Sequence, residues 1–68
     1  MNTTYYVRRS KNGRATRNLD KLITIMSTPR KIDALTTAAE CAIVNSGCHY
    51  YVYRGDTKIA KFYVKKES

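Results

Sequence analysis

One segment with helical periodicity, set between segments with strand patterning, most constrains how this chain can fold. Thr28 can cap a helix, Pro29 suits its first position, and Asp33 lies near its positive end. Gly47 stands where a left-handed residue often ends a helix. We therefore predict a helix over residues 29–45. Between these signals, six apolar residues follow the 3.6-residue period of one helix face: Ile32, Leu35, Ala38, Ala39, Ala42 and Ile43.

The chain before this helix begins with a strand-like run and a turn signal. Residues 3–7 form the first apolar run, and Tyr5, Tyr6 and Val7 suit a pleated surface. Asn12-Gly13 follows, a dipeptide in which both residues tolerate positive φ. The pattern predicts a strand followed by a chain reversal near Asn12-Gly13.

Two interpretations of residues 18–28 stay open. Asn18 could cap a helix, and four apolar residues after it fall at helical spacing: Leu19, Leu22, Ile23 and Met26. The run over residues 22–26 is compact, however, and three of its residues are β-branched. A short run of this kind, bounded by Ser27-Thr28-Pro29, is more typical of a strand. We favour the strand and keep the helix as the alternative.

The last third of the chain is typical of a β-hairpin. The segments 48–54 and 57–65 flank Gly55-Asp56, a pair that fits a type II′ turn. A two-residue loop would pair Val52 with Ile59. A longer loop or a bulge would instead gather one apolar face, made of Val52, Ala60, Tyr50, Phe62, Cys48 and Val64. We assign the core from the second pattern and leave the register open.

The element order is therefore β-β-α-β-β, an α+β fold in which one small antiparallel sheet carries one packed helix. A chain of 68 residues can build one core, so we predict a single small basic domain over residues 1–68. No apolar run approaches the roughly 18 residues that a membrane span needs, and the N-terminus lacks a secretion signal. Two cysteines are too few for a secreted disulfide scaffold. We expect a cytoplasmic protein without a membrane partner.

Positive charge is the strongest functional signal in the sequence. There are 13 Lys or Arg residues against 5 Asp or Glu residues, which gives a net charge of +8. A phosphate backbone neutralises such an excess well, whereas a solvated hairpin tip is the structural alternative. The densest cluster holds five cations in ten residues with no acid: Arg8, Arg9, Lys11, Arg14 and Arg17.

Lysines and tyrosines share the predicted outer face of the C-terminal hairpin. Lys61 alternates with Phe62, so it points away from the predicted core. Interleaved aromatic and cationic side chains can stack bases and hold phosphates. The same residues also suit a protein-binding face, or an edge strand protected from aggregation. The candidate binding residues on this face are Lys58, Lys61, Tyr51, Tyr53 and Tyr63.

A third candidate anion site lies at the predicted helix start. Arg30 and Lys31 oppose the helix dipole there, which makes sense if they hold an anion together with the free backbone N–H groups. Alternatively, Asp33 offsets Arg30 as an i,i+3 pair.

Constellations for catalysis or metal binding are not apparent in the sequence. The one histidine, His49, has tyrosines as neighbours, and the five carboxylates lack a spacing suited to acid–base work. Cys41, Cys48 and His49 give at most three zinc ligands without a zinc-site spacing. Arg54-Gly55-Asp56 resembles an adhesion tripeptide, but turn chemistry already explains it. We expect no enzyme, no cofactor and no metal.

Two hypotheses for function follow. The first is a nucleic-acid-binding module, for DNA or RNA, that contacts the phosphate backbone through the basic loop and the Lys/Tyr face. A homodimer is possible because 68 residues offer little surface. The alternative is a small protein-binding inhibitor or adaptor that places its cationic face on an acidic surface of a larger complex. Size, charge and layout also suit the host-takeover proteins of bacterial viruses, anti-CRISPR inhibitors included.

Overall fold

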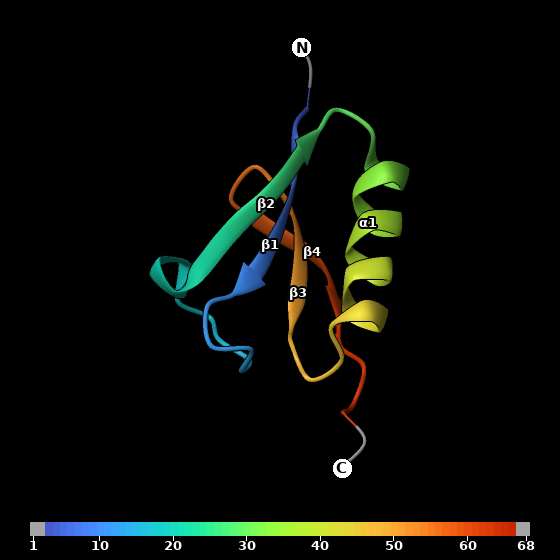
Figure 1. Cartoon of the computed structure of the whole chain (residues 1–68). Coiled ribbons are helices and arrows are strands. Elements are labelled where there is room, and N and C mark those ends of the chain that lie inside the picture. The colour runs from blue at the N-terminus through green and yellow to red at the C-terminus, as the bar shows by residue number, and fades with distance from the viewer. Residues whose placement is uncertain (1–2, 67–68) are drawn as a thin grey trace.

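The computed structural model describes residues 3–66 and consists of one sheet with one helix against it (Figure 1). The strands are in the order β2-β1-β3-β4, and all neighbours are antiparallel. This confirms the predicted α+β fold with the order β-β-α-β-β. Along the chain the elements are β1 (Tyr5–Ser10), the 3-10 helix η1 (Leu19–Lys21), β2 (Leu22–Thr28), α1 (Lys31–Val44), β3 (Tyr50–Arg54) and β4 (Thr57–Phe62).

Helix α1 starts two residues later than the prediction and ends one residue earlier. The Thr28 hydroxyl accepts a hydrogen bond from the Arg30 N–H (3.2 Å), so it closes the turn before the helix and does not cap the helix itself. Arg30 stands at the N-cap without a side-chain cap. Gly47 does have the expected positive φ of 90°, and its N–H donates to the Val64 carbonyl. Gly47 therefore turns the chain after α1 toward the segment that follows β4.

Three alanines place α1 close to the sheet. Ala34, Ala38 and Ala42 are spaced four apart and fully buried, and they pack with Val7 and Val52 in the core. Because alanine has no side chain beyond Cβ, this face lets the helix backbone approach the strands.

The predicted apolar stripe is therefore wrong at both of its isoleucines. Ile32 is 63% exposed and Ile43 is 67% exposed, because they lie on the side of α1 away from the alanine row. Ala38 and Ala42 are buried as predicted, and Leu35 packs against the core. Within residues 3–66, no helix has the length and apolar character that crossing a membrane requires.

The strand interpretation of the segment before α1 is confirmed. Residues 22–28 form β2, while η1 precedes it and is capped by Asn18, whose side chain accepts from the Asp20 N–H (3.0 Å). Opposite β1, the register shifts so that Ile25 is an extra residue in β2. The chain also reverses after β1 as expected, but through a connection over residues 11–21 instead of a tight hairpin.

The C-terminal hairpin has both the two-residue turn and the bulge that the sequence offered as alternatives. Arg54 pairs with Thr57 across a two-residue turn in which Gly55 has a φ of 60°. A bulge at Ile59 then shifts the register, so that Val52 pairs with Ala60 as the apolar pattern required. The strands are shorter than predicted, and Cys48 and Val64 lie beyond their ends. Val64 is exposed, whereas Cys48 packs against the core.

The close approach of α1 predicts the effect of enlarging one alanine. We expect Ala38→Leu to lower the free energy of unfolding by about 1–3 kcal/mol, because the added atoms must push the helix away from the sheet. Thr36→Leu adds a similar side chain at an exposed position of the same helix and serves as the control. Urea unfolding of both variants measures the difference, and equal midpoints would contradict the packing described here.

Candidate functional site

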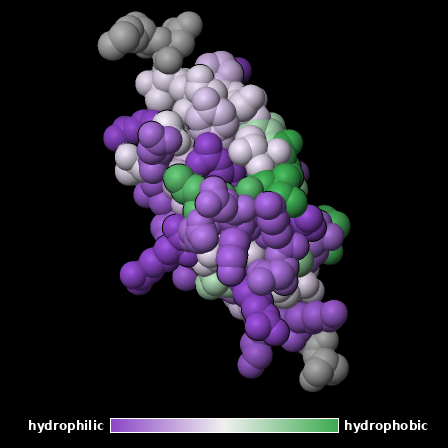
Figure 2. All heavy atoms as spheres, turned by 90° about the vertical axis from the view of Figure 1, so that its left-hand side faces the viewer, coloured by the Kyte–Doolittle hydropathy of each residue, from purple (hydrophilic) through white to green (hydrophobic). Residues whose placement is uncertain are grey.

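The face of the sheet opposite α1, called the open face below, carries the candidate site. Residues paired directly across antiparallel strands point to the same side. Since Val7 and Val52 point to α1, their neighbours along each strand point to the open face. Figure 2 looks at the side of the molecule away from α1 and shows hydrophilic side chains gathered over its lower half. The strands contribute Tyr6, Arg8, Tyr51, Tyr53, Lys58 and Lys61 to this face.

Two tyrosines of β3, Tyr51 and Tyr53, lie on the predicted face, but they are covered. Tyr51 is 1% exposed and Tyr53 is 5% exposed. The Lys58 ammonium lies 5.1 Å from the centre of the Tyr51 ring, and the Arg8 guanidinium lies 4.6 Å from the centre of the Tyr53 ring. These rings therefore support cations in the structure, and a base could stack on them only after those cations had moved.

Arg8 is held in place by three contacts. Its guanidinium lies between the rings of Tyr53 and Tyr6, the second at 4.9 Å from the ring centre. Its Nε donates a hydrogen bond to the Thr24 hydroxyl (3.1 Å). Cation–π contacts stabilise such an arrangement by about 0.5–2 kcal/mol, depending on burial. The side chain of Arg8 is thus oriented before any ligand arrives.

The loop after β1 folds onto the open face. The Asn12 side-chain oxygen accepts from the Arg14 N–H (2.9 Å) and from the Ser10 hydroxyl (3.0 Å), which tightens the turn. The Thr16 N–H then donates to the Tyr51 hydroxyl (3.2 Å), a contact between residues 35 positions apart. This bond places the backbone beside Arg17 on top of β3.

A second anchor of the loop is Gly13, which is buried and has a φ of 79°. Its carbonyl accepts from the His49 N–H (3.1 Å) and lies 2.9 Å from His49 Nδ1. Because a carbonyl can only accept, Nδ1 carries a proton here. The His49 ring also stacks on Tyr63, with 4.1 Å between ring centres. A Cβ added at Gly13 would meet Cys48 Sγ at 3.3 Å, so the loop is in close contact with the segment just before β3.

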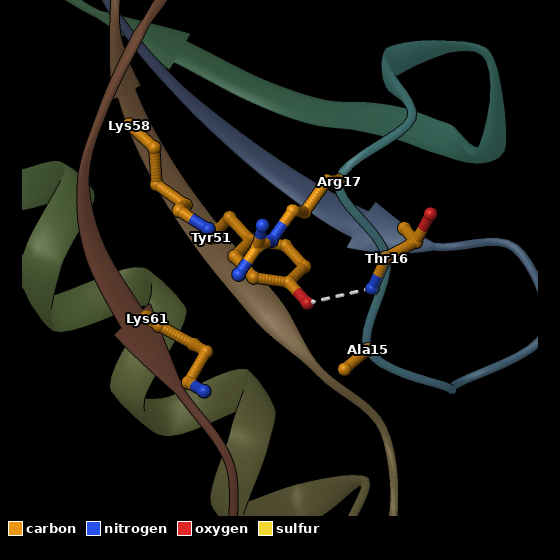
Figure 3. A pocket seen from close by; sticks show the side chains of 6 residues that line it. All are labelled: Ala15, Thr16, Arg17, Tyr51, Lys58 and Lys61. Atoms are coloured by element: carbon orange, nitrogen blue, oxygen red, sulfur yellow. Dashed lines mark hydrogen bonds between the residues drawn. The ribbon is translucent and has the colours of Figure 1, made fainter.

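Three cations converge where the loop meets β4. They surround a hollow of about 330 Å³ lined by Ala15, Thr16, Arg17, Tyr51, Lys58 and Lys61. In Figure 3 the Arg17 side chain from the loop and the Lys58 side chain from β4 extend toward the Tyr51 ring, and the Lys61 side chain ends farther along β4. The Tyr51 oxygen accepts from Thr16, which leaves its own proton free to donate to a ligand.

No acidic side chain lines this hollow. Among the described residues the acids lie in η1, in α1 and in the β3–β4 turn. The one ion pair found in residues 3–66 joins Arg30 to Asp33 (3.8 Å), and both side chains are exposed. Cations held near one another without an acid repel, and a bound anion removes that repulsion. The arrangement is suited to a phosphate, which offers several acceptor oxygens at once.

The structure brings together some of the cations that the sequence suggested as three clusters and keeps others apart. Arg17 joins Lys58 and Lys61, and Arg8 lies on the same face. Lys11 and Arg14 are exposed in the loop beside them. Arg9 pairs with Tyr50, so it points to the helix side. Arg30 and Lys31 follow the end of β2, at the opposite end of the sheet from the loop, and Arg30 pairs with Asp33 as the alternative interpretation proposed. Ala15 and Thr16 also line the hollow, and the chain gives no local signal by which they could have been predicted.

Comparison with protein-family models, curated proteins and solved structures gives no match to this chain. Within residues 3–66, no group of three or more His, Cys, Asp or Glu side chains is placed to hold a metal ion. The function therefore has to be argued from the cations of the open face.

The contact between the loop and Tyr51 can be tested by removing one oxygen. We expect Tyr51→Phe to lower the free energy of unfolding by about 0.5–1.5 kcal/mol, since the Thr16 N–H loses its partner. Exchange of the Thr16 amide hydrogen, followed by NMR, should become faster by up to about tenfold. Tyr63→Phe, at an exposed ring, is the control. An unchanged Thr16 exchange rate would show that this bond does not hold the loop.

Proposed function

We propose that this protein binds nucleic acid through its phosphate groups, with the hollow at the centre of the binding surface. One observation supports this above all. Arg17, Lys58 and Lys61 come from two separate parts of the chain and converge on one hollow without an acid among the residues that line it. Without an anion such an arrangement costs free energy, because the cations repel one another. A bound anion is therefore its simplest explanation.

A polyanion suits the surroundings of the hollow better than a small anion alone. Arg8 lies on the same face, while Lys11 and Arg14 extend the positive surface along the loop. The rings of Tyr51 and Tyr53 are covered, so base edges and base faces have little to contact there. We expect binding with little sequence preference and a strong dependence on salt.

Removal of the three converging cations tests the proposal. We expect Arg17→Ala/Lys58→Ala/Lys61→Ala to weaken binding of single- and double-stranded DNA and RNA by at least about tenfold at about 50 mM salt. Fluorescence anisotropy at several salt concentrations gives the slope of log K against log salt. If the slope falls by about 1, the three cations share one phosphate. If the slope falls by about 3, each cation contacts a separate phosphate.

The matched control removes three cations from the other end of the sheet. Arg30→Ala/Lys31→Ala/Arg54→Ala changes the net charge by the same amount. We expect this control to lose much less affinity than the variant at the hollow. If the two variants lose affinity equally, the total charge alone drives binding and the hollow is not the site. Urea unfolding of all variants separates lost contacts from lost folding, because Lys58 also covers Tyr51.

A protein partner is the second candidate function, and α1 supplies the observation that favours it. Ile32, Ile43 and Val44 are exposed on the helix, on a side of the molecule that the open face does not include. An inhibitor or adaptor would use these exposed apolar residues beside its positive charge. Failure of the parent protein to bind any of the four nucleic acids at low salt would favour this function. A stable complex that survives nuclease treatment would then identify the partner.

A further inference from the structure

One tyrosine ring near the hollow differs from the others of the open face because no cation lies on it. The rings of Tyr6, Tyr51 and Tyr53 each support a cation. Within residues 3–66, no such contact is found at the ring of Tyr63, and this residue is 45% exposed. The Tyr63 ring is therefore accessible to a ligand, unlike the covered rings of β3.

A row of parallel rings joins Tyr63 to the hollow. The Tyr63 ring stacks on His49, with 4.1 Å between the ring centres and 15° between the ring planes. His49 is also nearly parallel to Tyr51, at 6.4 Å and 17°, and Tyr51 lines the hollow. The His49 ring is itself held in place, because its Nδ1 donates to the Gly13 carbonyl. The position of the Tyr63 ring relative to the hollow is thus set before any ligand binds.

The strand geometry places Tyr63 next to one of the cations of the hollow. Phe62 packs against the core, so its neighbours Lys61 and Tyr63 point to the open face. Two residues span about 6–7 Å along an extended chain. A phosphate held by Lys61 in the hollow and a base of the same strand beside it can therefore be bound together.

We infer that the free face of the Tyr63 ring stacks on an unpaired base, so that the ligand is single-stranded nucleic acid. This inference deepens the proposed function and rests on it. His49 covers one face of the ring, which leaves the other face for a ligand. The bases of a duplex are already stacked and paired, whereas those of a single strand can stack on an aromatic side chain. Such stacking tolerates any base, in agreement with the weak sequence preference expected above.

Two variants of Tyr63 test the inference. We expect Tyr63→Leu to weaken binding of a single-stranded oligonucleotide by about five- to 100-fold, because the aromatic surface is lost. The slope of log K against log salt should stay the same, since no cation is removed. Tyr63→Phe keeps the ring and should bind like the parent protein. Fluorescence anisotropy gives these affinities, and strands made as DNA and as RNA show which of the two binds more tightly.

Two further ligands separate stacking from phosphate contact. An abasic strand has the same number of phosphates as the normal strand but no bases, and a duplex has its bases paired. Tyr63→Leu should leave the affinity for both of these ligands unchanged. In NMR spectra of the parent protein, the Tyr63 ring protons should shift when the normal strand is added, and the abasic strand should shift them much less. This measurement replaces the variant if Tyr63→Leu fails to unfold cooperatively in urea.

The outcomes distinguish this inference from the proposed function. The inference is overturned if Tyr63→Leu binds the normal strand as the parent does, or loses as much affinity for the abasic strand and the duplex. Binding through the hollow would then still stand on the three cation variants. If the parent protein binds none of these ligands, the proposed function fails, and the inference fails with it.

Discussion

Strand β3 is buried on both of its faces, and the rest of the structure depends on how that is achieved. Helix α1 covers Tyr50 and Val52 on one side. The described residues 3–66 hold no second α-helix for the other side, yet Tyr51 and Tyr53 are buried there as well. Their cover consists of the loop after β1 and of long cationic side chains. Such side chains can lay their methylene groups on apolar surface while their charged ends stay in water.

The cations of the open face therefore have two roles. Arg8 and Lys58 exclude water from aromatic rings, and the same side chains supply the positive charge of the candidate site. A side chain already held by a ring or a hydroxyl loses less rotational freedom when it binds a phosphate. The covering of β3 thus also orients the cations of the candidate site, and it brings tyrosines and cations together on this sheet.

The order of the elements could be predicted from the sequence because each depends on local signals: Gly55 for the last turn, the compact run of β2, and the period of α1. The buried side of α1 could not be predicted, because two different rows follow a helical period. One is the alanine row that begins at Ala34, and the other is the stripe that contains Ile32 and Ile43. The alanine row is the one buried because its smaller residues allow the helix to lie closer to the sheet.

The candidate site was predicted as clusters along the chain. Its centre instead depends on the bond from Thr16 to Tyr51, which joins distant residues and leaves no local pattern.

The contact between Gly13 and Cys48 ties the loop to the chemistry of one sulfur atom. Cys48 is a free thiol, and its Sγ lies where even one added carbon on Gly13 would be crowded. A group attached to that sulfur competes for space with Gly13 and so crowds the loop that carries Arg17. Alkylation of Cys48, once the other free thiol at Cys41 has been replaced, thereby becomes a way to disturb the cationic loop without changing any charged residue.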